Sequence, residues 1–296
     1  MNVVRARILG FCSGVRRAVD LAYEEADAYK EDHKPVYTLG PLIHNPQVLE
    51  ELKRRGVEIL NEEHLPEDLR GASVIIRAHG ISPQTEAELH RRGAKVIDAT
   101  CPRVKSSQLK AASFAQSGYC LFLAGEERHA EITGIRGYYE AVAHNNPSRF
   151  CAVVSCAAEA EKAAAQLRED SSNAKTALIG QTTISAEEYR DIAEAITPFF
   201  PGLEIAQTIC AATGERQDSL REIADKVDAI IIAGGKASAN TRRLLAIAEA
   251  AGKPCALAET PADIPPDFLT FNSIGLASGT STPDTVIDDI EKAMYY

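Results

Sequence analysis

Long hydrophobic runs are missing from the 296-residue chain. Nowhere do about 18 apolar residues follow one another, which is the length that a membrane-spanning helix needs. The N-terminal stretch MNVVRARILGFCSGV has too short an apolar segment for a signal peptide and no small-residue cleavage site. We therefore expect a soluble protein of the cytoplasm, with no membrane partner and with two or three domains of ~100–150 residues.

Positive charge is also in short supply. The chain has 32 Lys and Arg against 42 Asp and Glu, a net charge of −10. Nucleic acids and anionic membranes attract basic surfaces, so this balance disfavours both as partners. An anionic substrate would have to be bound by local groups.

Closely spaced cysteine pairs are absent too. The seven cysteines are an odd number without tight spacing, which is not typical of a disulfide framework, and they lack the C-x-x-C pairs of a zinc ribbon. In a reducing compartment they stay thiols. Some of them are therefore candidate metal ligands.

What the chain does have is an alternation of short β-branched runs with amphipathic stretches, the pattern of βαβ units in an α/β fold. We expect strands within 3–9, 35–39, 73–78, 94–99, 119–124, 151–155, 176–180, 203–207, 229–234, 254–258 and 273–278. Helical periodicity marks 45–56, 84–93, 186–196 and 239–252. Ser82, Ser185 and Ser281 are placed to begin helices, and Ser185 forms a capping-box pattern with Glu188.

A pattern of strand, cysteine and long helix recurs about every hundred residues, at Cys12, Cys101 and Cys210. Ligands of parallel sheets collect beyond the carboxyl ends of the strands. Three such sheets around an axis would bring these cysteines together. Cys120, Cys151 and Cys255 instead begin strands, where a small buried side chain is the usual role. Cys156 also follows a strand and opens a helix, so the pattern does not exclude it.

Other polar residues follow strands at the same edge: His44, His79, His129, Glu131, Thr182, Ser238, Asn240 and Ser281. Some have simpler explanations, since Ser281 could cap a helix and His44 could be a loop residue. Gly234 and Gly235 resemble a phosphate-binding turn only weakly. The convergence of these polar residues on one edge of the sheets nevertheless favours a functional site.

Three widely separated thiolates suit an iron–sulfur cubane better than a zinc site. Such clusters normally take four cysteines, so three leave one iron with an open position for substrate. An iron–sulfur sensor that regulates a partner is an alternative, and a structural zinc protein is a poorer one.

The chain resembles a known family at eight motifs, which occur in the family's order: FCSGV, HNPQV, RAHG, DATCP, HAE, QTTIS, ICAATGERQ and ASGTSTPD. This family is the 4-hydroxy-3-methylbut-2-enyl diphosphate reductases, LytB-type iron–sulfur oxidoreductases that carry out the last step of isoprene biosynthesis by the methylerythritol phosphate pathway. The resemblance implies three αβα modules with mainly parallel sheets around a pseudo-threefold axis, with the cluster at the centre. In this chain the modules would be 13–101, 102–209, and 210–296 together with 1–12.

The resemblance also implies roles for single residues. A [4Fe-4S] cluster would be held by Cys12, Cys101 and Cys210, with Cys156 excluded. The diphosphate would be bound by His44, His79, Ser238, Asn240 and Ser281. Glu131 would supply protons, with His129 near the substrate hydroxyl and Thr182 orienting the reacting groups. Desolvation and nearby negative charge should raise the pKa of Glu131, as that role requires. The electron donor would be a small ferredoxin or flavodoxin.

Two motifs depart from the family. Ala130 replaces the proline of the usual H-P-E, which keeps both reactive groups. Ala239 removes one hydroxyl from the usual K-N-S-S-N loop, and a lost charge-assisted bond of about 1.5–3 kcal/mol would weaken substrate binding roughly ten- to a hundredfold unless a backbone N–H or a water replaces it. Quinolinate synthase, a condensing enzyme that also places three cysteines around a cluster, is an alternative whose motifs do not match.

Overall fold

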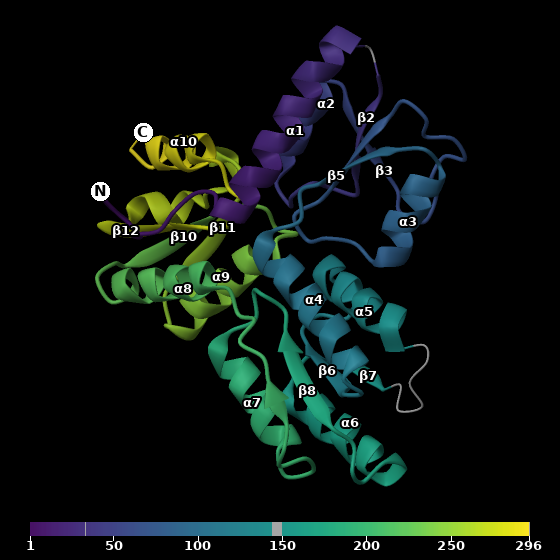
Figure 1. The fold of residues 1–296 in the computed structure, drawn as a ribbon. Helices are drawn as coiled ribbons and strands as arrows, with labels where there is room; N and C mark the ends of the chain where they lie inside the picture. The colour runs from purple at the N-terminus through teal and green to yellow at the C-terminus, as the bar shows by residue number, and fades with distance from the viewer. Residues whose placement is uncertain (33, 144–149, 296) are drawn as a thin grey trace. The chain divides into compact units, whose positions relative to one another are not determined.

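A computed structural model describes residues 1–32, 34–143 and 150–295 of the chain (Figure 1). It confirms an α/β fold with three four-stranded sheets. The first sheet has the order β1 (Asn2–Arg5), β12 (Ser273–Ser278), β10 (Ala229–Ala233) and β11 (Cys255–Ala258). The second has β3 (Val57–Leu60), β2 (Val36–Leu39), β4 (Ser73–Ile76) and β5 (Lys95–Asp98). The third has β7 (Cys151–Val154), β6 (Cys120–Ala124), β8 (Thr176–Gly180) and β9 (Glu204–Ile205).

Parallel strands need crossover connections, and helices supply them here. The described helices are α1 (Ser13–Asp32), α2 (Pro46–Arg54), α3 (Pro83–Arg91), α4 (Pro102–Gln116), α5 (Ala130–Ala143), α6 (Ala157–Asp170), α7 (Ala186–Ile196), α8 (Ala211–Ala224), α9 (Ala239–Ala250) and α10 (Asp284–Ala293). Short 3₁₀ turns lie at Pro261–Asp263 and Pro266–Thr270. In the part of the chain that the structure describes, no helix combines the length and apolar character needed to cross a bilayer.

The chain forms two compact units. The first contains Met1–Asp32, Pro41–Glu58 and Ala211–Tyr296, and the second contains His33–Gly40 and Ile59–Cys210. The sheet of β1, β12, β10 and β11 lies in the first unit, and that of β7, β6, β8 and β9 lies in the second. The boundaries of the three modules, and their arrangement about an axis, stay predictions.

The first unit has a core on each face of its sheet. Ile231 packs with Ile287 of α10 on one face, and Ile230 packs with Leu220 of α8 and Leu244 of α9 on the other. Successive strand residues point to opposite faces, which explains why β10 is buried throughout. Figure 1 shows α10 on one side of this sheet and α8 and α9 on the other. Each fully buried Ile or Leu contributes about 1.5–3 kcal/mol.

The second unit is built in the same way. In its third sheet, Leu121 packs with Ile135 of α5, whereas the neighbouring residue Phe122 packs with Ile192 of α7 on the opposite face. Helices α4 and α5 therefore cover one face, and α6 and α7 the other. The loops that leave the carboxyl ends of these strands are thus fixed at both of their ends by buried elements.

The local sequence signals predict most of these elements correctly. Ser82 caps α3 by accepting a hydrogen bond from Thr85 N at 3.1 Å, and Ser185 forms the expected capping box with Glu188. One described strand, β3, is not predicted: its middle residues are exposed, so the run lacks the buried pattern of the other strands. The capping role of Ser281 is wrong, because Pro283 precedes the first residue of α10 and leaves Ser281 outside the helix.

Candidate functional site

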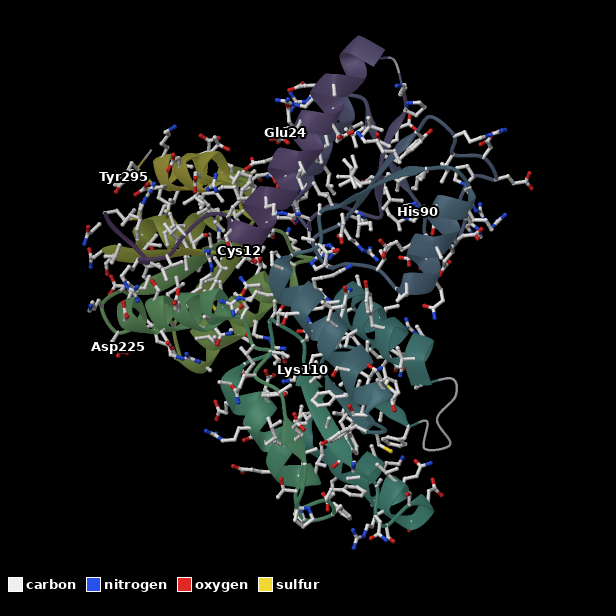
Figure 2. All side chains as sticks on the ribbon, in the orientation of Figure 1. Cys12, Glu24, His90, Lys110, Asp225 and Tyr295 are labelled. Carbon is white, nitrogen blue, oxygen red and sulfur yellow. The ribbon has the colours of Figure 1, made fainter. Side chains whose placement is uncertain are left out.

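The three candidate cysteine ligands share one local position, directly before the first residue of a long helix. Cys12 precedes α1, Cys101 precedes α4 and Cys210 precedes α8; Figure 2 shows Cys12 at the start of α1. The carbonyl groups of Cys12 and Cys101 accept the first helical hydrogen bonds, each at 2.9 Å. A helix N-terminus carries partial positive charge, which attracts anionic groups.

Each of these cysteines is also tied to another candidate loop through its backbone N–H. Cys12 N donates to Thr280 O at 3.2 Å, next to Ser281. Cys101 N donates to Ala78 O at 2.9 Å, next to His79, and Cys210 N donates to Thr182 O at 2.9 Å. The backbone therefore places each cysteine beside a predicted site residue of its own unit.

The other four cysteines differ in environment. Cys120 is buried, Cys151 and Cys255 are half-buried, and all three begin strands as expected. Burial raises the pKa of all three thiols, that of Cys151 to about 11, so they stay protonated at neutral pH and are poor ligands. Cys156 precedes α6 and is exposed. Within the described residues, no three His, Cys, Asp or Glu side chains are grouped closely enough to hold a single metal ion. An iron–sulfur cubane does not need such a group, because each of its thiolate ligands binds a different iron atom.

Glu131, the one carboxylic acid among the candidate residues, is almost completely buried. It lies in the first turn of α5 and is 1% exposed. Thr182 N donates to its Oε1 at 2.6 Å, and Thr182 Oγ1 donates to its Oε2 at 2.9 Å. Burial raises the pKa of Glu131 to about 7, although the two hydrogen bonds from Thr182 lower it. The direction expected from the sequence is confirmed, and desolvation is the cause.

His129 lies beside Glu131. Its Nδ1 accepts a hydrogen bond from Glu131 N at 3.2 Å, which leaves the ring proton on Nε2. The rings of His79 and His129 meet edge to face, with centroids 5.2 Å apart. The second unit therefore brings His79, His129, Glu131 and Thr182 into one connected group.

Gln181 joins the two loops that carry this group. Its Oε1 accepts a hydrogen bond from Glu126 N at 3.1 Å, and its Nε2 donates to Thr183 Oγ1 at 2.8 Å. Gly125 allows this close approach, because a Cβ atom there would lie 2.8 Å from Gln181 Cβ. The loop after β6 is thus held against the loop after β8.

Three loops of the first unit meet in a second group. A Cβ atom on Gly235 would overlap the carbonyl oxygen of His44, so this glycine of the G-G-K turn allows the two backbones to approach closely. A Cβ atom on Gly279 would overlap Thr241 Oγ1, which brings the loop after β12 against α9. His44, the Gly234–Asn240 loop and the Ser281 loop therefore lie together.

Several polar side chains of this second group are buried without partners. Asn240 is 3% exposed and Ser281 is 5% exposed. Neither amide atom of Asn240 nor Ser281 Oγ makes a hydrogen bond among the described residues, and neither does Thr241 Oγ1. Each unsatisfied buried group costs about 1–3 kcal/mol, which a polar ligand would offset. Ser238 differs, because its Oγ caps α9 by accepting from Thr241 N at 3.3 Å.

Sequence reasoning missed Thr241, Arg216 and Gln217, which lie in helices and not directly after strands. A usable signal was present in α8: Thr213, Arg216, Gln217 and Leu220 follow the i, i+3, i+4, i+7 spacing of a buried helix face, and all four are buried. Polar residues on such a face need a partner in the interior.

The comparisons with known proteins agree along the whole chain. Residues 3–295 match the family described as LytB protein. A 4-hydroxy-3-methylbut-2-enyl diphosphate reductase of Treponema denticola is 43% identical over 297 residues, which cover 99% of each chain.

Two solved structures are similar as well. The E-1-hydroxy-2-methyl-but-2-enyl-4-diphosphate reductase of Plasmodium falciparum has a TM-score of 0.85 at 26% identity and covers 98% of this chain and 87% of its own. A second solved structure, described as (E)-4-hydroxy-3-methyl-but-2-enyl diphosphate reductase, has a TM-score of 0.69 at 35% identity and covers 100% and 99%. The chain belongs to the LytB protein family.

Proposed function

We propose that this protein is a 4-hydroxy-3-methylbut-2-enyl diphosphate reductase. It takes an allylic alcohol diphosphate, two electrons and two protons, and it releases water and isopentenyl or dimethylallyl diphosphate. The observation that carries the proposal is the buried Glu131 carboxyl group, held at both oxygens by Thr182 with a pKa of about 7. A chain of this family with such a group has a proton donor suited to neutral pH.

The donor set fits an iron–sulfur cluster. Cys12, Cys101 and Cys210 each lie directly before the first residue of a long helix, where the partial positive charge of the helix end attracts an anionic group, whereas burial keeps Cys120, Cys151 and Cys255 protonated. We infer that the first three would hold a [4Fe-4S] cluster, and that Cys156 does not take part. When bound, the cluster supplies electrons, and its iron without a thiolate supplies a Lewis acid.

The residues of the first unit would bind the diphosphate. Asn240 and Ser281 present unpartnered polar atoms from buried positions, and Ser238 lies at the N-terminus of α9, where backbone N–H groups favour anions. His44 lies against the same loop through Gly235. The family resemblance assigns His79 the same role. The missing hydroxyl at Ala239, the first residue of α9, would be compensated by these donors.

Glu131 would protonate the leaving hydroxyl group. Its pKa of about 7 leaves a large protonated fraction at neutral pH, and the carboxylate that remains is stabilised by the two Thr182 donors. His129 carries its proton on Nε2 and can donate to the substrate oxygen. Thr182 fixes the direction of the Glu131 carboxyl group. Electrons would come from a small ferredoxin or flavodoxin in the cytoplasm.

The test is an anaerobic assay of the purified protein. Iron and sulfide are measured first, and a reduced dye is then mixed with the allylic diphosphate. We expect two electrons consumed per substrate and isoprenoid diphosphates as products. A cluster-bearing protein that consumes no electrons would contradict the reductase and favour a condensing enzyme or a sensor.

A further inference from the structure

Arg216 is a buried cation with an unusual set of partners. It lies in α8 and is 2% exposed. Its Nη2 donates to Gly10 O at 2.8 Å, and its Nη1 donates to Ser278 O at 2.8 Å and to Ser278 Oγ at 3.2 Å. Among the described residues no carboxylate pairs with it, although buried charges are normally paired.

These hydrogen bonds join the loop that carries Cys12 to the end of β12. Gly10 lies two residues before Cys12, and Gly10 N donates to Ser278 Oγ at 2.9 Å. Farther along both loops, Cys12 N donates to Thr280 O at 3.2 Å. The guanidinium group thus links the loop that carries Cys12 to the end of β12, because each of its acceptors belongs to one of these two segments. Its rigid, planar fork holds the two loops in fixed directions, whereas an ammonium group donates its hydrogen bonds from a single nitrogen atom.

Arg216 interacts electrostatically with Cys12. Burial lowers the pKa of Arg216, and the negative charge that a Cys12 thiolate would carry raises it. An arginine stays protonated even when buried, because a guanidinium group is a very weak acid. In a dry interior the attraction between the two charges is much stronger than in water.

We propose that Arg216 is a positioning residue for Cys12 and the buried counter-charge of an iron–sulfur cluster bound through that thiolate. This inference rests on the cluster proposed above. Reduction adds one electron from the donor protein and so adds one negative charge. A fixed positive charge beside the cluster stabilises the reduced state and raises the reduction potential.

The test compares Arg216→Met with Arg216→Lys in the cluster-bearing protein. Arg221→Met is the matched control, since Arg221 lies in the same helix, is exposed and pairs with Asp218. Iron content and thermal unfolding are measured on all three, and the cluster is titrated with a mediator dye while its electron paramagnetic resonance is recorded.

For Arg216→Met we expect about a tenfold fall in the equilibrium constant for one-electron reduction, which is a fall of ~59 mV. Arg216→Lys keeps the charge, so its potential should stay near that of the wild type while its unfolding temperature falls. Arg221→Met should match the wild type in both.

Equal potentials for Arg216→Met and Arg221→Met would overturn the proposal, and so would a potential for Arg216→Lys as low as that of Arg216→Met. If Arg216→Met does not fold, Arg216→Gln carries the same test, because it removes the charge and leaves a polar side chain in the buried position. A wild-type protein without iron and sulfide would contradict the cluster itself, and that result is distinct from an unchanged potential.

Discussion

Thr182 donates hydrogen bonds to both oxygens of Glu131, from its backbone N at 2.6 Å and from its hydroxyl at 2.9 Å. One residue therefore fixes the position, the direction and part of the charge of a carboxyl group buried at 1% exposure. The backbone of Thr182 also accepts a hydrogen bond from Cys210 N at 2.9 Å. The candidate proton donor and a candidate cluster ligand thus share one neighbour.

Replacing Glu131 by Gln should abolish most turnover while the protein keeps its cluster and its substrate affinity. The amide accepts from Thr182 N and donates to Thr182 Oγ1, so the geometry survives, but the amide supplies no proton. Loss of a general acid lowers kcat by about 10²–10⁴. Steady-state rates with a reduced dye measure kcat, and iron content measures the cluster. Turnover equal to that of the wild type would remove Glu131 from the mechanism.

The same variant should change how stability depends on pH. In the folded protein burial raises the pKa of Glu131 from 4.5 to about 7. Below pH 4.5 both states are protonated and no effect is expected. As pH rises toward 7 the unfolded chain loses its proton while the folded protein keeps it, so the wild type loses stability, by up to about 3 kcal/mol. Glu131→Gln lacks this loss.

Urea unfolding at pH 5 and pH 8 measures the difference between the two proteins. We expect the free energy of unfolding of Glu131→Gln, relative to that of the wild type, to be larger at pH 8 than at pH 5. The control is Glu159→Gln: Ser155 donates to Glu159 and lowers the pKa of that carboxyl group, so Glu159 is ionised in both the folded and the unfolded state at pH 5 and pH 8, and this variant should differ from the wild type equally at both. A difference between wild type and Glu131→Gln that is equal at both pH values would contradict a carboxyl group that titrates near neutrality.

Replacing Asn240 or Ser281 by Ala should weaken substrate binding without weakening the fold. Their polar atoms lack hydrogen bonds among the described residues, so deletion removes no internal bond. Each lost bond to an anion of about 1.5–3 kcal/mol corresponds to a roughly ten- to hundredfold rise in KM. Ser238→Ala is the contrast, because loss of the α9 cap should cost about 1 kcal/mol of stability. A clear stability loss in Asn240→Ala with unchanged KM would assign that residue to the fold.

Serine substitutions should separate the cysteines into two classes. Cys12→Ser, Cys101→Ser and Cys210→Ser should each lose most of the iron and sulfide. Cys156→Ser should keep both, since Cys156 is exposed and lies outside the proposed ligand set. Iron and sulfide analysis and the visible spectrum under nitrogen measure the outcome. Cluster loss in Cys156→Ser would break the ligand assignment.

Local sequence signals predicted many of the helices and strands. Periodicity marked the long helices, and the Ser185 capping box formed as expected because capping involves residues three positions apart. Strand β3 was not predicted, because its middle residues Glu58 and Ile59 are exposed and its sequence pattern is not that of a buried strand. The capping role of Ser281 was wrongly predicted for a different reason. A serine before a proline marks a helix start only to within a residue or two, and the helix begins at Asp284.

The sequence by itself determined the α/β class, the strand ends where polar residues gather and the family to which the motifs point. Only the tertiary structure decided that Thr182 donates to both oxygens of Glu131, that Asn240 holds unpartnered polar atoms, and that Arg216 donates to Gly10 O in the loop that carries Cys12. The reason is physical: Glu131 and Thr182 are 51 positions apart, and Gly10 and Arg216 are 206 apart. Burial and charge at such sites depend on which strands become neighbours in a sheet, and no local pattern encodes that order.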